Sequence, residues 1–381
     1  MTHVVMGASH GRHVGGTETH LLDLVWALAH SGDRVTVVHR SPGHAVVPGV
    51  EFVHVPIDAD AGPVLSDLAP DIVHVHGEGL RPQEAQAQRR RRPVVRSLHD
   101  WSVNCSSGTL LRNGDAACPR AHGPGCLLHI INRSCTERPN PLPALGRWRA
   151  LGAVRKEVEQ AMAVVVYSEY AREVAIRNGI APDRCHVLPY FVDAAVAATP
   201  PAGDGRVCFV GRLTKLKGVD LLLEAVARSR RVTHLEVVGD GYYGNELARL
   251  ADRLDIASRV TFSGWMDPGA TQSAMHAADL VAVPSIWPEP FGIVGLEAMA
   301  ASRGVIASGS GGIPDWLKDG ETGRIVRSPD AASWATALDE AIENKSLLAR
   351  WSAAGAREVR RFSREHHLRA LRSIYAAIAT R

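Results

Sequence analysis

The 381-residue sequence has almost no net charge, few aromatic residues and no long apolar run. Its 43 Lys and Arg nearly balance its 40 Asp and Glu, which argues against a protein that binds nucleic acid mainly by neutralising phosphates. No run approaches the roughly 18 apolar residues of a membrane-spanning helix. The N-terminal MTHVVMGASH lacks the basic and long apolar segments of a secretion signal. We therefore expect a cytoplasmic protein whose contact with membranes is at most peripheral.

Histidine, cysteine and lysine are unevenly distributed in this chain. Fourteen of the 18 histidines and five of the six cysteines lie before residue 190, so the two halves differ in their chemistry. Only five of the 43 basic residues are lysines, a bias towards arginine that favours a GC-rich bacterial genome. Two of these rare lysines, Lys215 and Lys217, stand two residues apart and mark a segment that needs an explanation.

Short apolar runs alternate with helical patterns along both halves. The first run is followed by a glycine-rich loop, a helical stretch and a second run, which is how a doubly wound sheet begins. We expect strands at residues 3–6, 34–38, 72–75, 94–98, 164–167, 207–210, 235–238, 260–262, 280–283 and 305–307. This alternation predicts an α/β fold with parallel sheets covered on both faces.

A small, proline-rich and unpatterned stretch at 194–205 separates two such units. We therefore predict a first domain over residues 1–195 and a second over residues 206–362. The last stretch, 363–381, reads as a helix with no strand after it.

Two glutamates stand eight residues apart in the segment EPFGIVGLE. Pro288 and Pro290 keep Glu289 out of the helix, and Gly292 lets a helix start close to a ligand. Glu297 then lies about one and a half turns inside that helix. Because a helix N-terminus offers free N–H groups and partial positive charge, this segment suits an anion or sugar hydroxyls. The alternative is two ordinary acids at a helix start.

The segment VGRLTKLKG places basic residues at a strand end. Arg212 can hold a phosphate through its fork and Lys217 as a point charge, although a basic surface turn is the alternative. Glycines follow other strands of the same half, at Gly239, at Gly264 and in the segment 309–312. Since ligands of open α/β sheets bind at the carboxyl ends of strands, these loops and the glutamates are expected at one edge.

These motifs together resemble the retaining glycosyltransferases of family 4, the group 1 glycosyltransferases. The matching segments are VGRLTKLKG, VVGDG, FSGW, AADLVAVPS, EPFGIVGLE and GGIPDWLKDGETG in the second half, and GGTE, PDIVHVHG and RSLHD in the first. The resemblance covers nearly the whole chain. It implies the GT-B fold, in which two Rossmann-like domains face a cleft and the C-terminal helix packs back on the N-terminal domain.

The resemblance also implies residue roles on the donor side. Arg212 and Lys217 would bind the donor diphosphate and stabilise the leaving group. Glu297 would bind the nucleotide ribose, and Glu289 would hold hydroxyls of the transferred sugar together with nearby backbone groups. The implied donor-binding set is Gly16, Gly211, Arg212, Lys217, Gly239, Gly264, Glu289, Phe291, Gly292 and Glu297.

On the acceptor side, the resemblance places His99 beside the sugar. His99 ends the strand of RSLHD, and a buried structural histidine is the alternative. The other acceptor-side candidates are His13, Thr17 and Glu18, around the N-terminal GG loop. The implied catalytic set is His99, Arg212, Lys217 and Glu289, and the family uses no catalytic metal.

The expected reaction is transfer of a sugar from a nucleotide-sugar, first of all a UDP-sugar, to a small-molecule or glycan acceptor with retention. Two alternatives stay open: a UDP-sugar 2-epimerase or hydrolase of the same superfold, and a non-catalytic zinc-bearing relative. The sequence Asp58-Ala59-Asp60 mimics the metal-binding motif of GT-A transferases, but no fitting strand precedes it, and we interpret it as a loop. Nucleic acid is not an expected partner.

Four cysteines gather in a Gly- and Pro-rich segment at about 104–143, which is too long for a plain loop. It resembles a cysteine-bearing insertion of some bacterial relatives. Zinc accepts mixed Cys and His ligands, so a structural zinc site is one interpretation. Free or redox-active cysteines and disulfides are the alternatives. The possible zinc ligands are Cys105, Cys118, Cys126, Cys135 and His129.

Overall fold

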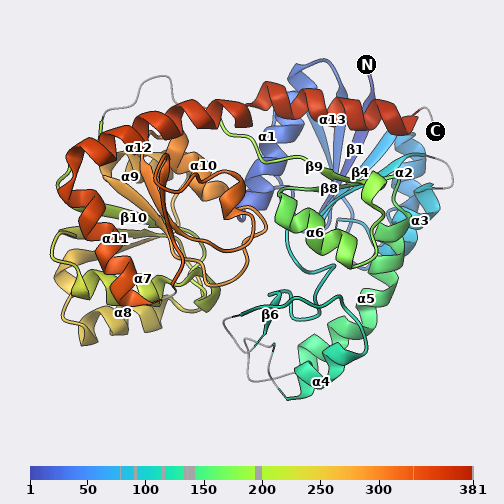
Figure 1. Ribbon diagram of the computed structural model, residues 1–381. Helices are drawn as coiled ribbons and strands as arrows, with labels where there is room; N and C mark the ends of the chain where they lie inside the picture. The colour runs from blue at the N-terminus through green and yellow to red at the C-terminus, as the bar shows by residue number, and fades with distance from the viewer. Residues whose placement is uncertain are drawn as a thin grey trace. The chain divides into compact units, whose positions relative to one another are not determined.

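The computed structural model describes residues 1–77, 79–89, 92–112, 116–132, 135, 142–193, 200–328 and 330–379 (Figure 1). Contacts divide the chain into two compact units. The first contains Met1–Tyr190 and Arg364–Arg381, and the second contains Phe191–Ser363. The chain therefore leaves the first unit once and returns to it with its last helix.

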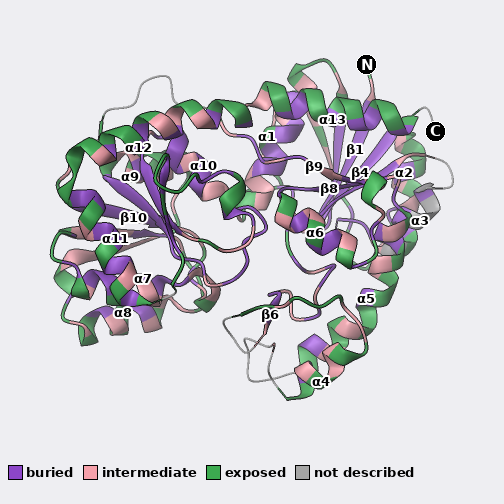
Figure 2. Cartoon of the chain, in the orientation of Figure 1, coloured by how far each residue is buried: buried purple, intermediate pink, exposed green. Residues whose placement is uncertain are grey.

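A parallel seven-stranded sheet forms the centre of the first unit, in the order β3-β2-β1-β4-β5-β8-β9. Its strands are β1 (His3–Ala8), β2 (Arg34–His39), β3 (Val50–His54), β4 (Ile72–His76), β5 (Val94–Ser97), β8 (Ala163–Val166) and β9 (Cys185–Val187). The central strands β1, β4, β5 and β8 are buried along their whole length (Figure 2). Parallel strands covered on both faces need such apolar runs, which is why their sequence patterns were readable.

Helices pack around this sheet. They are α1 (Gly16–His30), α2 (Gly62–Leu68), α3 (Pro82–Arg89), α5 (Leu142–Gln160), α6 (Glu169–Arg177) and α13 (Arg364–Ala379). Helix α13 packs on α1, and a hydrogen bond of 2.7 Å joins the Tyr375 hydroxyl to Nδ1 of His74 on β4. The Arg372 guanidinium also pairs with Asp33 at 2.8 Å. The expectation that the last helix packs back on the N-terminal unit is confirmed.

The cysteine-rich segment adds short elements to the first unit. They are β6 (Leu111–Arg112), β7 (Ala116–Ala117) and α4 (Gly125–Ile131), and α4 packs on α5. Residues 113–115, 133–134 and 136–141 of this segment lie outside the described residues.

The second unit is built on a parallel six-stranded sheet in the order β12-β11-β10-β13-β14-β15. Its strands are β10 (Arg206–Val210), β11 (His234–Val238), β12 (Val260–Gly264), β13 (Leu280–Val283), β14 (Gly304–Ser308) and β15 (Gly323–Val326). Its helices are α7 (Val219–Arg228), α8 (Gly244–Arg253), α9 (Pro268–Ala277), α10 (Ile293–Ala300), α11 (Ala331–Glu343) and α12 (Lys345–Glu358). The predicted α/β fold with two Rossmann-like halves is confirmed.

The segment predicted to separate the two units is described only from residue 200 onward, because residues 194–199 lie outside the described residues. Its described end is held by the buried Asp279, whose carboxylate accepts bonds from the N–H groups of Gly203 at 2.6 Å and Gly205 at 2.8 Å. Within the part of the chain that the structure describes, no helix combines the length and apolarity needed to cross a membrane.

Candidate functional site

Glycines bring the loops at the carboxyl edge of the second sheet into close contact. Gly239, after β11, has φ +135°, and a Cβ there would lie 2.0 Å from the carbonyl oxygen of Gly211, after β10. The Gly239 N–H donates to the carbonyl of Gly264 at 2.8 Å. A Cβ on Gly311, after β14, would lie 2.1 Å from the carbonyl oxygen of Glu289, after β13. Side chains at these positions would force the loops apart, so the backbone approach depends on glycine.

Lys217 and Glu289 form an ion pair at this edge. Nζ of Lys217 lies 2.6 Å from Oε1 of Glu289 and 5.3 Å from the centre of the Trp287 ring. Lys217 comes from a short helical turn, Lys215–Lys217, and Glu289 comes from the loop between β13 and α10. The Ser285 hydroxyl donates to the same carboxylate oxygen. The structure thus brings together two residues that the sequence placed in separate motifs.

The carboxyl group of Glu289 stays ionised although it is buried. Its side chain is 5% exposed, against 21% for Lys217. Burial raises the pKa of Glu289, but the charge of Lys217 and hydrogen bonds from Lys217 and Ser285 outweigh burial, and the pKa lies below its ordinary value. The result is a fixed pair of opposite charges beside the start of α10.

Helix α10 begins where the sequence predicted. Gly292 is its N-cap residue with φ +87°, a left-handed conformation that favours glycine. The Trp316 indole donates to the Phe291 carbonyl at 2.7 Å, and a Cβ on Gly295 would lie 1.9 Å from the Trp316 ring. Trp316 therefore fixes both the entry and the first turn of α10. Glu297 is half-buried in the second turn.

Arg212 lies on the same loop as Lys217 and is exposed. Its guanidinium forms no ion pair with any residue that the structure describes. Lys215, the other rare lysine, is also exposed, with Nζ 5.6 Å from the centre of the Tyr243 ring. Of the two lysines, Lys217 is the one that joins the candidate donor site.

His99 follows β5 in the first unit and is buried, with both ring nitrogens hydrogen-bonded. Nδ1 lies 2.7 Å from the Tyr190 hydroxyl, and Nε2 lies 2.9 Å from Nδ1 of His76. The Tyr167 ring stacks on it at 4.7 Å between ring centres. Burial and the nearby Arg96 lower the pKa of His99 to about 3, so the ring is neutral at physiological pH. Sequence reasoning found His99 but not the partners that orient it.

The acceptor-side candidates gather at the start of α1. Gly16 and Thr17 open the helix, Glu18 lies in its first turn, and Nδ1 of His13 lies 3.2 Å from the Thr19 hydroxyl. Thr17 also shares a hydrogen bond with Tyr190, the tyrosine that contacts His99. The GG loop and His99 are therefore connected through one hydroxyl group.

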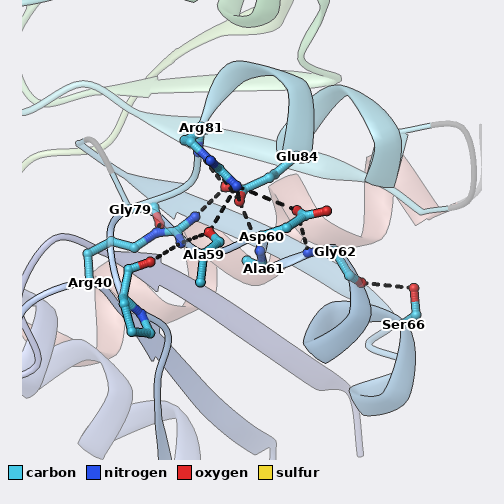
Figure 3. A network of polar contacts seen from close by, with 10 residues as sticks. Arg40, Ala59, Asp60, Ala61, Gly62, Ser66, Gly79, Arg81 and Glu84 are labelled. Atoms are coloured by element: carbon cyan, nitrogen blue, oxygen red, sulfur yellow. Dashed lines mark hydrogen bonds and ion pairs between the residues drawn. The ribbon is translucent and has the colours of Figure 1, made fainter.

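A buried ion-pair network, missed by sequence reasoning, holds the neighbouring loops of the first unit (Figure 3). The Glu84 side chain, which is fully buried, accepts bonds from the guanidinium groups of Arg40 and Arg81 and from the Ala61 N–H. Arg40 also donates to the Gly79 carbonyl at 3.0 Å. Asp58-Ala59-Asp60 lies in one of the loops held in this way, in agreement with the interpretation of that sequence as a loop. A buried strand followed directly by an arginine, as β2 is by Arg40, was the available signal.

The four clustered cysteines are half-exposed and free. Among the described residues, no group of three or more His, Cys, Asp or Glu side chains is placed to hold a metal ion. His129 instead lies with Nε2 at 3.0 Å from an Arg120 guanidinium nitrogen. Burial and the neighbouring thiols of Cys105, Cys126 and Cys118 raise the pKa of Cys135 to about 12, so the four thiols lie near one another although no metal-holding arrangement is found among the described residues. Metal analysis of the purified protein, with Cys118→Ser and Cys126→Ser variants, separates zinc from free thiols.

Two family models match the two halves of the chain. The model described as "Glycosyltransferase Family 4" matches residues 14–196, and "Glycosyl transferases group 1" matches residues 196–358. D-inositol 3-phosphate glycosyltransferase of Mycobacterium tuberculosis is 31% identical over 346 residues, which cover 85% of this chain and 70% of that protein.

Solved structures agree with this comparison. Anabaena HepE in complex with UDP and glucose has a TM-score of 0.74 and 20% identity, with 99% of this chain and 100% of that chain covered. Sucrose-phosphate synthase of Thermosynechococcus elongatus has a TM-score of 0.75 and 20% identity, with 99% of both chains covered. At this identity these structures show the GT-B fold alone. The matched family models and the mycobacterial relative show that the chain belongs to the group 1 glycosyltransferases of family 4 and is a glycosyltransferase that uses a nucleotide-sugar donor.

Proposed function

We propose that this enzyme transfers a sugar from a UDP-sugar to a small-molecule or glycan acceptor with retention of configuration. The observation that carries the proposal is the Lys217–Glu289 pair beside the N-terminus of α10. It offers a cation for a diphosphate and an ionised carboxylate for sugar hydroxyls within one hydrogen bond of each other. We assign the donor to the second domain, residues 206–362, and the acceptor to the first, residues 1–195.

In this proposal, the positive groups of the site stabilise the leaving nucleoside diphosphate. Negative charge builds on the β-phosphate as the glycosidic bond breaks, and fixed cations lower the energy of that state. Lys217 is held in place by Glu289, whereas the exposed Arg212 closes on the diphosphate only when it binds. No protein nucleophile and no metal is needed for this step.

Glu289 and Glu297 position the rest of the donor. A carboxylate has about four acceptor positions, so Glu289 can hold Lys217 and Ser285 and still accept from a sugar hydroxyl. The Trp316 indole donates to the Phe291 carbonyl and so fixes the turn whose backbone groups, at Phe291 and Gly292, we assign to the sugar. Glu297 binds the ribose, and the backbone near Gly264 receives the base.

The comparisons supply the substrate classes of the proposal. The Anabaena structure of the same fold holds UDP and glucose, which supports a UDP-sugar donor. The mycobacterial relative is named for D-inositol 3-phosphate, a small polar molecule, which supports an acceptor of that kind. We place the reaction in the cytoplasm, because all six cysteines are free thiols, as suits a reducing compartment.

The test is a donor screen followed by a transfer assay. A nucleotide-sugar that binds the folded protein raises its unfolding temperature, so a thermal-shift screen identifies nucleotide and sugar together. The best donor is then incubated with and without candidate acceptors, and the anomer of the product is determined by NMR. We expect UDP release that depends on acceptor. Rapid UDP release or epimerisation with the donor alone would instead assign the chain to the epimerase or hydrolase reaction.

A further inference from the structure

Three strongly exposed apolar side chains lie on α4 and at the start of α5. Leu128 is 68% exposed, Ile131 is 63% exposed and Leu142 is 68% exposed. Single exposed apolar residues are ordinary on protein surfaces, but three on two helices that pack together are not. Figure 2 shows α4 mostly as exposed and half-buried residues.

Other residues of this region are buried or hydrogen-bonded. Ile130 of α4 and Ala144 of α5 are buried, and the Trp148 indole of α5 donates to the Gly123 carbonyl just before α4 at 3.3 Å. Leu128 and Ile131 are three residues apart and therefore lie on the same face of α4, opposite the packed side.

The same region is strongly basic, although the whole chain is nearly neutral. Residues 104–160, which run to the end of α5, contain eight Arg and Lys against four Asp and Glu, a formal charge of +4, so the rest of the chain carries −1. Of the four acidic residues, Asp115 and Glu137 lie outside the described residues, Glu157 pairs with Arg96, and Glu159 pairs with Arg155. The basic side chains exposed on the described parts are Arg120, Arg147, Arg149 and Lys156.

We propose that this apolar–basic surface, formed by Leu128, Ile131 and Leu142 with Arg147 and Arg149, binds the surface of an anionic lipid bilayer. Leucine and isoleucine side chains enter the boundary between headgroups and acyl chains, while arginines bind the headgroup phosphates. A second copy of the chain fits less well, since a two-fold contact would bring one basic surface against another. Binding through one small surface is weak, reversible and sensitive to salt.

The experiment measures co-sedimentation of the full chain with vesicles of phosphatidylcholine, with and without about a third of phosphatidylglycerol. One variant carries Leu128→Ser, Ile131→Ser and Leu142→Ser, and another carries Arg147→Gln and Arg149→Gln. The matched control carries Val46→Ser and Ile57→Ser, which are 93% and 65% exposed in the same unit. Unchanged unfolding temperatures show that each variant is folded.

We expect the wild type and the control to bind vesicles that contain phosphatidylglycerol, and to bind pure phosphatidylcholine at least about tenfold more weakly. The partition coefficient of the apolar variant should be at least about tenfold lower than that of the wild type. The partition coefficient of the arginine variant should fall about fivefold for each charge removed, at low ionic strength.

Equal binding by the apolar variant and the control, or no binding by the wild type, would overturn the proposal. Sedimentation velocity, which measures the oligomeric state, is the second test. If the wild type is a dimer that the apolar variant converts to monomers, the surface is an interface between copies of this chain and not a lipid site. None of these outcomes depends on the donor chemistry proposed above.

Discussion

Replacement of Lys217 by alanine should leave the Glu289 carboxylate buried without its cation. The two charges are 2.6 Å apart, and the Glu289 side chain is only 5% exposed. Removal of one partner from a fully buried pair costs about 3–5 kcal/mol. Because Lys217 keeps 21% of its side-chain exposure and water can approach the site, we expect a loss of about 2–3 kcal/mol at neutral pH.

The size of this loss should depend on pH. In the wild type, the folded-state pKa of Glu289 is lowered, so the pair stabilises the protein above the unfolded pKa of about 4.3, and this contribution disappears as pH falls through the folded pKa. Without Lys217, burial dominates and the pKa of Glu289 rises above its ordinary value. The variant then becomes less stable relative to the wild type as pH rises from about 4 to 7.

Urea unfolding of Lys217→Ala, Glu289→Gln and the double variant, at about pH 4.5, 6 and 7.5, measures this effect. Glu289→Gln should restore stability to Lys217→Ala, because a neutral amide needs no cation. It should not restore sugar transfer, because the loss of Lys217 lowers kcat/KM about 10²–10³-fold relative to the wild type. Lys215→Ala is the matched control and should behave as wild type. A loss of stability that is the same at every pH, or a Lys217→Ala enzyme as active as the control, would refute the reasoning.

Three further predictions concern stability and the first unit. His74 and His99, with pKa values of about 3, and His367, with a pKa of about 4, are buried and neutral in the folded protein. Below about pH 6.5 the unfolded chain binds protons at these histidines and the folded protein does not, so the free energy of unfolding falls as pH falls. Stability should fall by about 2 kcal/mol for each of them between about pH 7 and 5, and a flat urea-unfolding profile over this range would contradict that. Gly239→Ala should destabilise by more than about 2 kcal/mol, since its Cβ would meet the Gly211 carbonyl, whereas Gly264→Ala, with open space around it, should cost about 1 kcal/mol in thermal unfolding. Tyr190→Phe removes the hydroxyl that joins Thr17 to His99, and it should cost about 1–3 kcal/mol of stability and lower kcat/KM about tenfold; an unchanged kcat/KM would separate His99 from the reaction.

The sequence predicted the inner strands of both sheets and the edge strand β12, but it missed the edge strands β3, β9 and β15. β1, β4 and β13 are buried along their length and appear as continuous apolar runs. β3 and β9 are the two edges of the first sheet; no residue of β3 is buried, and in β9 only Cys185 is. Strands exposed on one side carry polar residues, so their sequences look like loops. The edge strand β15 of the second sheet was missed in the same way.

The candidate site was predictable where its residues lie within one motif. The glutamates, glycines and basic residues of the second unit were found from their spacing. Their supports were not, because the contacts join distant parts of the chain: Glu289 to Lys217 over 72 residues and His99 to Tyr190 over 91 residues. The sequence around Tyr190 does not indicate that its hydroxyl contacts His99, and only the folded structure shows this contact.

The return of α13 to the first unit has a consequence for protein synthesis. The 173 residues of Phe191–Ser363 must be made before α13 emerges, which takes roughly 9–35 s at bacterial or eukaryotic ribosome speeds. Until then, the buried His74 of the first sheet lacks the Tyr375 hydroxyl that is its hydrogen-bond partner. The first unit, although translated first, is therefore the last to be completed, and a ribosome-bound chain stalled before residue 364 should be far more sensitive to protease in its N-terminal half than the released enzyme.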